Sequence, residues 1–213
     1  MPQPPSHESR PIRPVEFVAE TLLPTERGRY RVRAYRDHND NTEPVALIWG
    51  DVEGRRHLPV RVHDECATSE VFGSLKCDCK DQLEYALEFI RNQGGGIVIY
   101  LRQEGRGIGL ANKIAAYALQ EQGLDTVDAN RALGLPDDAR RYDAAEAILR
   151  DLDVNDILLM TNNPRKIEKL RDLGVSIAGR VPVEVGTNPH SEGYLNAKVE
   201  RMGHVIDLPM ASK

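Results

Sequence analysis

Strand-like and helix-like apolar segments alternate along this chain, and that alternation limits the possible folds more than any other feature. Five segments have the apolar pattern of strands: residues 30–36, 45–49, 58–63, 97–101 and 157–160. We expect the second and third of them to pair as a hairpin across residues 53–55. The run over residues 97–101 is apolar throughout, which indicates a buried strand.

Helical spacing of apolar residues marks the segments between these strands. Helices are expected over residues 81–92 and 110–122, and from Pro164 to the stop at Gly174. The helix over residues 110–122 carries on one face Leu110, Ile114, Tyr117 and Ala118. After a loop over residues 126–141, another helix has as its inner residues Ala145, Ile148, Leu149 and Leu152. The alternation predicts an α/β domain, with a mixed β-sheet core and helices packed on its faces; an α+β arrangement is the alternative.

The length of 213 residues is enough for one domain with a substantial core. We expect a disordered, Pro-rich leader over residues 1–14, one folded domain over residues 15–207 and a flexible tail over residues 208–213. No stretch approaches the roughly twenty apolar residues that span a bilayer, and the N-terminus lacks the apolar core of a signal peptide. We therefore expect no membrane partner and a cytoplasmic location. The net charge of -5 argues against a nucleic-acid partner.

All three cysteines lie within fourteen positions, as Cys66, Cys77 and Cys79. The ten residues between the first and the second can fold back and bring the thiols together. Three soft thiolates favour zinc, and three protein ligands leave a fourth position open for water or a substrate atom. His63 could also be a ligand, although the three cysteines are the favoured set. Unrelated buried thiols, or a disulfide with one spare cysteine, are the alternatives.

A glycine-rich segment over residues 102–109 leads from an expected strand into an expected helix. Its glycines let backbone N–H groups approach an anion closely, and Arg102 and Arg106 add donors that suit phosphate. The glycine spacing is not that of a dinucleotide-binding fingerprint. A charged surface turn is the alternative interpretation.

Two further loops precede expected helices. Residues 135–142 hold two acids and two arginines, and residues 161–166 combine a hydroxyl, two amides and a lysine. The second loop could bind phosphate or ribose. Structural salt bridges and helix N-caps are simpler explanations for each loop taken alone.

Taken together, four motifs resemble GTP cyclohydrolase II enzymes in their residues and their order. They are Arg-Val-His-x-Glu-Cys at residues 61–66, Cys-Asp-Cys at 77–79, Arg-Gln-Glu-Gly-Arg-Gly-Ile-Gly at 102–109 and Thr-Asn-Asn-Pro-x-Lys at 161–166. The resemblance extends over about residues 23–204 and implies that residues 15–207 form the catalytic domain. Enzymes of this family open the imidazole ring of GTP, release C8 as formate and cleave off pyrophosphate. The product is 2,5-diamino-6-(5-phosphoribosylamino)pyrimidin-4-one, and the reaction is the first step of riboflavin biosynthesis.

The resemblance implies a role for each group of residues. Zinc would bind Cys66, Cys77 and Cys79, with a water in the fourth position whose pKa the metal lowers so that hydroxide can attack C8. The GTP-binding positions fall on Arg61, Val62, His63, Asp64, Glu65, Gln82, Glu104, Gly105, Arg106, Thr126, Thr161 and Lys166. Magnesium is expected on the triphosphate, and the family implies a homodimer.

Three further positions would be catalytic. Asp138 matches the family's proton acceptor. Arg140 matches an arginine proposed as a nucleophile, although a protonated guanidinium more easily stabilises the leaving pyrophosphate. Tyr117 matches a tyrosine linked to complete hydrolysis of the formyl group, and its apolar helix face is also consistent with simple packing. One departure is visible, because Arg141 stands where many relatives carry an acid.

Two other functions stay open from the sequence. A paralog of a specialised pathway could stop at the formamidopyrimidine or use a related nucleotide. A nucleotide-binding regulator could keep zinc structurally, with the site closed by a fourth ligand such as His63; the presence of Asp138, Arg140 and Tyr117 argues against it.

Overall fold

The computed structural model describes residues 15–185, apart from the side chain of Thr126. The expected leader over residues 1–14, the expected tail over residues 208–213 and the C-terminal part of the expected domain lie outside the described residues. Across residues 15–185, no helix is both long enough and apolar enough to cross a membrane.

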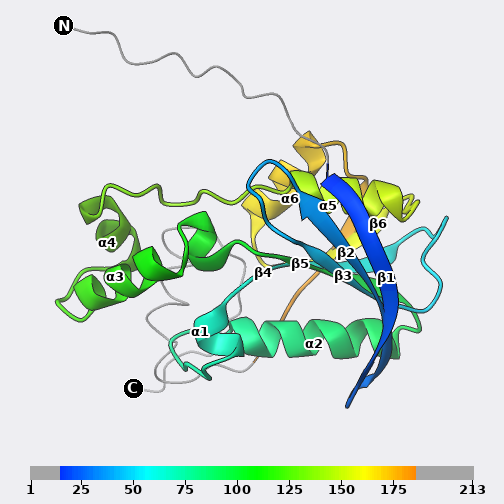
Figure 1. The fold of residues 1–213 in the computed structure, drawn as a ribbon, viewed down its shortest axis with the longest axis horizontal. Coiled ribbons are helices and arrows are strands. Elements are labelled where there is room, and N and C mark those ends of the chain that lie inside the picture. Colours follow the sequence, from blue (N-terminus) through cyan, green and yellow to red (C-terminus); the bar gives the residue numbers. More distant parts are fainter. Residues whose placement is uncertain (1–14, 186–213) are drawn as a thin grey trace, which may run out of the picture.

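A mixed sheet of seven strands forms the centre of the described chain (Figure 1). Its strands are β1 (Val15–Thr25), β2 (Gly28–Asp37), β3 (Val45–Trp49), β4 (Leu58–Asp64), β5 (Gly96–Leu101), β6 (Ile157–Met160) and β7 (Ile177–Val181). They lie in the order β1-β2-β3-β5-β4-β6-β7. Pairs from β1 to β5 are antiparallel, and pairs from β5 to β7 are parallel. The predicted single α/β domain with a mixed sheet is confirmed.

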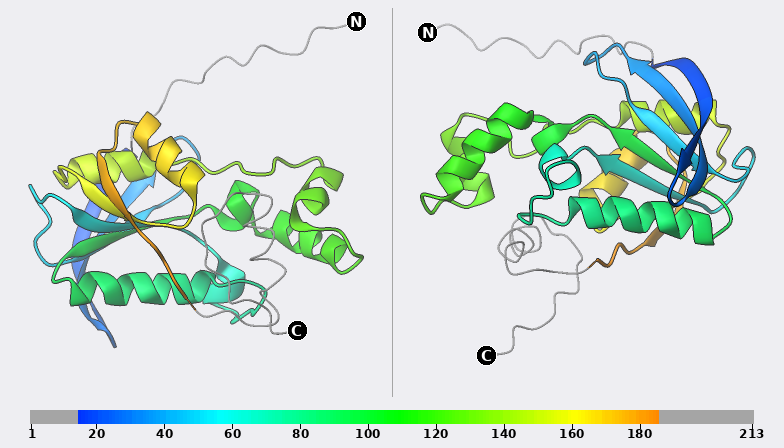
Figure 2. Two further views of the ribbon diagram at one scale, coloured as in Figure 1. Left: turned by 180° about the vertical axis from the view of Figure 1, so that it is seen from behind. Right: turned by 60° about the horizontal axis from the view of Figure 1, so that its bottom comes forward.

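Helices cover both faces of the sheet. The helical elements are α1 (Ala67–Glu70), α2 (Cys79–Asn92), the 3-10 helix η1 (Glu104–Gly107), α3 (Leu110–Gln120), α4 (Thr126–Ala132), α5 (Asp143–Asp151) and α6 (Pro164–Asp172). α2 lies along one face, and α5 and α6 lie along the other (Figures 1 and 2). In β5, Ile97 and Ile99 pack in the core on the α5 side, whereas Val98 packs on the α2 side. Each of these side chains is fully buried, which stabilises the fold by about 1.5–3 kcal/mol per side chain.

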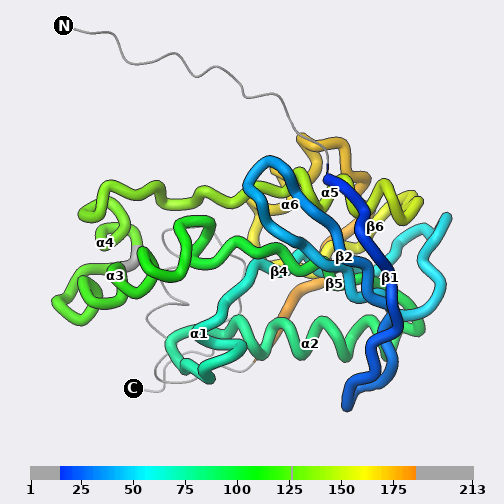
Figure 3. Tube along the Cα trace, in the orientation of Figure 1, coloured from blue at the N-terminus to red at the C-terminus, as the bar shows by residue number. Residues whose placement is uncertain are grey.

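The chain between β5 and α5 forms an arm beside the sheet (Figure 3). It leaves β5 through η1, forms α3 and α4, and returns over residues 133–142. Asp125 caps α4 by accepting hydrogen bonds from the backbone N–H groups of Val127 and Asp128. Because the arm begins where β5 ends, α3 lies at that end of the sheet.

Two strand predictions need correction. Residues 45–49 and 58–63 form β3 and β4, but they do not pair as a hairpin, because β5 lies between them. β4 is buried almost throughout, and it pairs in parallel with β5 on one side and β6 on the other. The edge strands β1 and β7 were not among the predicted segments. Because β1 is mostly exposed, it lacks the buried apolar pattern that marks a strand in a sequence.

The helix predictions are confirmed for α2, α5 and α6, and all four predicted inner residues of α5 are buried. The predicted loop over residues 126–141 is wrong in its first part, which forms α4. In α3 the predicted apolar face is not covered, since Leu110 and Ile114 are 38% and 50% exposed. Helical spacing shows which residues share a face, but the fold decides what covers that face.

Candidate metal and nucleotide site

The carboxyl ends of the parallel strands β4, β5 and β6 meet at one edge of the sheet and open into a cavity. β4 leads into Glu65 and Cys66, β5 into residues 102–109, and β6 into residues 161–166. The motifs that follow these strands are far apart in sequence, yet they line one cavity together with the start of α2. This is the position where open α/β sheets bind their ligands.

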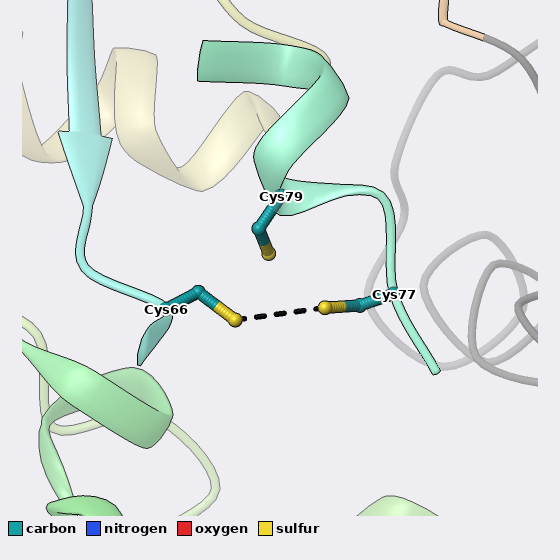
Figure 4. A group of neighbouring side chains, drawn as sticks. All are labelled: Cys66, Cys77 and Cys79. Atoms are coloured by element: carbon teal, nitrogen blue, oxygen red, sulfur yellow. Dashed lines mark hydrogen bonds between the residues drawn. The ribbon is translucent and has the colours of Figure 1, made fainter. Parts of the chain in front are cut away.

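The three cysteines form a compact cluster at this edge (Figure 4). Cys66 follows β4, Cys79 begins α2, and the three sulfur atoms lie within 4.8 Å of one another. The Sγ atoms of Cys66 and Cys77 are 3.5 Å apart, close to the roughly 3.8 Å expected for two sulfurs bound at about 2.3 Å to one tetrahedral zinc. None of these three cysteines forms a disulfide. The donor set and its spacing fit one zinc ion.

Lys113 of α3 lies beside this cluster. Its Nζ donates hydrogen bonds to Cys66 Sγ at 3.0 Å and to Glu104 Oε1 at 2.7 Å. Hydrogen bonds with the neighbouring thiols, and then the charge of Lys113, lower the pKa of Cys66. Burial acts to lower the pKa of Lys113, but Glu104 and Cys66 outweigh burial and raise it. Cys66 is thereby favoured as a thiolate, the form that binds metals.

His63 lies near the cysteines, but its ring is engaged elsewhere. Nε2 contacts Glu70 Oε1 at 2.9 Å, and the same oxygen accepts a hydrogen bond from the backbone N–H of Cys66. The other oxygen of Glu70 accepts a hydrogen bond from Tyr100 at 2.6 Å. Burial lowers the pKa of His63, so the ring is neutral and its Nε2–H donates to Glu70. The cluster of candidate ligand atoms contains the three cysteines without His63.

Arg61, two residues before His63, is also buried. Its Nη2 donates a hydrogen bond to Gln82 Oε1 at 2.6 Å, and its Nη1 donates to the carbonyl of Met160 at 2.9 Å. Its Nε has no hydrogen-bond partner within residues 15–185. Arg61 lines the cavity, so its guanidinium can contact a ligand there.

Asp64 anchors a cationic cluster on the other face of β4. Its Oδ2 accepts hydrogen bonds from Lys166 Nζ at 2.9 Å and from Arg140 Nη1 at 3.1 Å. Burial alone would raise the pKa of Asp64, but the charges of Lys166 and Arg140 lower it to about 2. Burial is the largest influence on Lys166 and lowers its pKa to about 8. Asp64 thus holds both cations at the cavity, where their N–H groups suit an anionic ligand.

Arg140 is held by a second acid. Its Nε and Nη2 donate to the two carboxylate oxygens of Asp138 at 2.9 and 2.8 Å, in a bidentate arrangement. Burial opposes the charge of Arg140, but Asp138 and Asp64 raise its pKa well above the ordinary value. Arg140 in turn outweighs burial and lowers the pKa of Asp138. Both groups are therefore ionised at neutral pH.

Arg141 points away from this pair. Its Nε donates to Asp143 at 3.1 Å, and its side chain is 47% exposed. The backbone of Arg141 is clamped by the side-chain amide of Gln103, which accepts from its N–H and donates to its carbonyl, both at 2.7 Å. No local sequence pattern predicts these two hydrogen bonds, because the two residues lie 38 positions apart.

Most of the predicted site residues meet at the cavity. Together with the three cysteines, the lining includes Arg61, His63, Asp64, Glu65, Gln82, Glu104, Gly105, Arg106, Tyr117, Arg140, Thr161 and Lys166. The side chain of Val62 lies in the core, and its carbonyl reaches the site by accepting a hydrogen bond from Lys166. Asp138 reaches the site through Arg140. Thr126 begins α4, and its side chain lies outside the described part of the chain.

Gln103 and Lys113 are among the lining residues that were not predicted. Lys113 had an available signal, since it precedes Tyr117 by four residues and so shares its helix face. Arg102 lies at the rim instead, where its Nε is 3.6 Å from Glu65.

The fold and the site define an α/β protein with a three-cysteine metal site at one wall of a cavity and arginine and lysine at another. This combination is that of a metal-dependent enzyme for a phosphorylated substrate. The family model described as GTP cyclohydrolase II matches residues 16–182. The chain belongs to the GTP cyclohydrolase II family.

Curated relatives agree with this assignment. GTP cyclohydrolase-2 of Acinetobacter baumannii strain SDF is 51% identical over 194 residues, covering 90% of this chain and 96% of the relative. Riboflavin biosynthesis protein RibBA of Bacillus subtilis strain 168 is 49% identical over 193 residues, covering 90% of this chain and 48% of that longer relative. A crystal structure of RibBX, a two-domain 3,4-dihydroxy-2-butanone 4-phosphate synthase from A. baumannii, shows a weaker likeness. Its TM-score is 0.44 at 18% identity, over 81% of this chain and 40% of that chain.

Proposed function

We propose that this chain uses zinc at its three cysteines to open the imidazole ring of GTP, with release of C8 as formate and of pyrophosphate. The remaining product is 2,5-diamino-6-(5-phosphoribosylamino)pyrimidin-4-one. The activity class follows from the family: the chain has GTP cyclohydrolase II activity, the first step of riboflavin biosynthesis, and GTP is its substrate. The observation that supports the finer proposal is one cavity lined by both the cysteine cluster and the Arg140 and Lys166 cations.

Cys66, Cys77 and Cys79 would hold the zinc. When bound, zinc would supply a Lewis acid that activates water for attack on C8. Glu70 keeps the segment from His63 to Cys66 in place, since it accepts hydrogen bonds from the backbone N–H of Cys66 and from the ring of His63. These contacts hold the first ligand in position before the metal binds.

The residues close to the metal site suit the guanine. Guanine presents a carbonyl oxygen and N–H groups, and the carboxylates of Glu65 and Glu104 are acceptors for such N–H groups. The guanidinium of Arg61, which lines the same cavity, is a donor that suits the carbonyl oxygen. Gln82 fixes this donor, because its amide accepts from Arg61 and donates to Asp78.

Arg140 and Lys166 suit the triphosphate. Asp138 and Asp64 keep Arg140 protonated, which supports electrostatic stabilisation of the departing pyrophosphate rather than nucleophilic attack. The ionised carboxylate of Asp138 supports its role as a proton acceptor. Magnesium would bind mainly through the phosphates, as it does in many nucleotide sites.

Tyr117 would help to complete hydrolysis of the formyl group. Its ring lines the cavity, with Lys76 Nζ 4.7 Å and Lys113 Nζ 5.8 Å from the ring centre. A phenol that lines the same cavity as the metal ligands can orient a water molecule. We expect Tyr117→Phe to accumulate the formamidopyrimidine, detected by mass. Unchanged formate release from this variant would contradict the role.

A homodimer is the proposed assembly. Apolar side chains on the arm support it, since Leu110, Ile114 and Leu133 are between 38% and 50% exposed. Exposed apolar residues grouped on neighbouring helices are typical of protein interfaces. The molecular mass in solution, measured by light scattering, tests the proposal directly.

One assay separates the possible functions. Zinc-loaded protein is incubated with GTP and magnesium, and formate, pyrophosphate and the pyrimidine product are measured. Equimolar formate and pyrophosphate support the proposed reaction. Pyrophosphate with a retained formyl group would indicate a paralog that stops at the formamide, and GTP binding without turnover would indicate a regulator.

A further inference from the structure

Lys113 lies between the metal ligand Cys66 and the loop over residues 102–109, called the substrate loop below. The proposed reaction gives Lys113 no role. Its ammonium has three N–H donors. Each has a partner within 3.0 Å: Cys66 Sγ at 3.0 Å, Thr68 Oγ1 at 2.8 Å and Glu104 Oε1 at 2.7 Å. Because the protein uses all three donors, Lys113 acts on its neighbours rather than on the substrate.

Glu104 extends this contact into the loop that follows β5. Its Oε1 also accepts from the N–H of Gly105 at 2.8 Å, and its Oε2 accepts from the N–H of Ala67 at 2.6 Å. Ala67 directly follows the metal ligand Cys66. One carboxylate thus joins the substrate loop, the ligand-bearing segment and Lys113.

Burial makes the charge of Lys113 important. Its side chain is 12% exposed and that of Glu104 is 8% exposed, so water screens their interactions weakly. The thiolate of Cys66 and the carboxylate of Glu104 are both negative, and both contact the same ammonium. Without that ammonium they would repel each other across a poorly screened gap. Three thiolates around a divalent cation also keep one net negative charge, which the ammonium balances.

We propose that Lys113 is a positioning residue that couples zinc binding to substrate binding. It balances the negative charge of the Cys66 thiolate, and it holds Glu104 in place to contact the guanine of GTP. The inference rests on the proposed zinc site. It has two consequences that a merely structural lysine would not have. Removal of the ammonium lowers zinc affinity, and it raises KM for GTP even when zinc is saturating.

Lys113→Met tests both consequences, because methionine keeps the apolar stem and removes the charge. We expect zinc affinity, measured by competition with a chromophoric chelator, to fall about 10- to 100-fold. At saturating zinc we expect KM for GTP to rise by about the same range, since Glu104 loses its anchor. In the cobalt-substituted variant, the thiolate-to-metal absorption band should shift, because Cys66 loses a hydrogen bond.

Two variants make the test specific. Lys80→Met is the matched control: Lys80 directly follows Cys79 and is exposed, so the same charge is lost without a change in zinc affinity or KM. Lys113→Arg keeps the charge but replaces a compact ammonium with a planar fork. We expect it to recover most of the zinc affinity while KM stays raised. Circular dichroism checks that each variant is folded, and if Lys113→Met is not, Lys113→Gln replaces it.

Zinc affinity is measured without GTP, so this result stands apart from the outcome of the formate assay. A folded Lys113→Met or Lys113→Gln protein with the zinc affinity and KM of the parent chain would overturn the proposal. Loss of zinc affinity in Lys80→Met as well would also overturn it, because the effect would then reflect overall charge.

Discussion

The two walls of the cavity carry different sets of charged groups. The cysteine wall holds three thiol groups, Glu104 and one cation, Lys113, which contacts Cys66 and Glu104. At the Asp64 wall, Arg140 and Lys166 share one buried carboxylate, with Asp138 behind Arg140. The first wall has anionic atoms to spare and is completed by a metal cation. At the second wall two carboxylates balance the two cations, and the N–H groups of Arg140 and Lys166 suit a phosphate group.

This difference explains how one cavity can accept both ends of a nucleotide. Arg61, Asp64 and Cys66 all come from β4 and the turn after it, and alternation along the strand sends Arg61 and His63 to one face and Asp64 to the other. A single strand therefore contributes to both walls. Changes confined to one wall should impair ring opening or phosphate handling separately.

The largest effect is expected for Cys77→Ser at the cysteine wall. Replacement of a thiolate by a poor zinc ligand should reduce formate release to background, because the remaining two thiolates no longer fit a catalytic zinc site. GTP binding, measured by calorimetry, should persist because the Asp64 wall is unchanged. Substantial formate release from this variant would show that the zinc assignment is wrong.

The next largest effect is expected for Asp64→Asn at the opposite wall. Loss of this carboxylate leaves Arg140 and Lys166 poorly balanced in a buried site, and should lower the free energy of unfolding by about 3–5 kcal/mol. Urea denaturation measures this change, and added pyrophosphate should restore part of it. The exposed Asp172 provides the control, since Asp172→Asn should change stability by less than about 0.5 kcal/mol.

The sign of the pH dependence follows from the lowered pKa of Asp64. A carboxyl group whose pKa is depressed in the folded state stabilises the fold above its ordinary pKa, and that contribution is lost as the pH falls through about 2. The stability difference between the parent chain and Asp64→Asn should therefore shrink in acid. A difference that stays constant down to pH 2 would contradict the pairing of Asp64 with its two cations.

A smaller effect is expected from the titration of Lys166. Because burial lowers its pKa to about 8, the free protein loses this cation as the pH rises above 8. Binding of an anionic triphosphate should weaken accordingly, and kcat/KM should fall by up to about tenfold per pH unit above that pKa. Lys166→Arg keeps its charge throughout this range, so its kcat/KM profile should lack this alkaline fall. An identical fall in both proteins would assign it to another group.

The smallest effect is expected for Arg141→Asp, at the edge of the second wall. The side chain of Arg141 is half-exposed and pairs with Asp143, so its charge is screened by solvent. Replacement should change kcat/KM for GTP by less than about fivefold, the range of an exposed ion pair. A larger change would show that the charge of Arg141 affects phosphate handling.

The sequence allowed most of the site to be predicted where the groups that meet are close together in the chain. Cys77 and Cys79 are neighbours, and Cys66 is close enough in sequence for the chain to fold back, so local spacing predicted the cluster. Asp138 and Arg140 likewise form their pair within one short loop. The contacts of Lys113 with Cys66 and of Gln103 with Arg141 span 47 and 38 positions, and no local pattern marks them.

The strand predictions show the same limit. Residues 45–49 and 58–63 were correctly identified as strands, but their pairing was wrong, because β5 enters the sheet between them from more than thirty residues downstream. The apolar pattern of a segment indicates whether the segment is buried or exposed. It does not indicate which other segment pairs with it.

By itself, the sequence determined which chemical groups this protein has and the local order in which they occur: three thiols, paired acids and arginines, and the strands and helices that carry most of them. The tertiary structure alone decided that the cysteines and the phosphate-binding cations line one cavity, that Asp64 balances two cations, and that Lys113 joins a metal ligand to Glu104. The physical reason is that charge balance and burial depend on distances between residues far apart in the chain. Those distances are set by the order of β3, β5, β4 and β6 in the sheet.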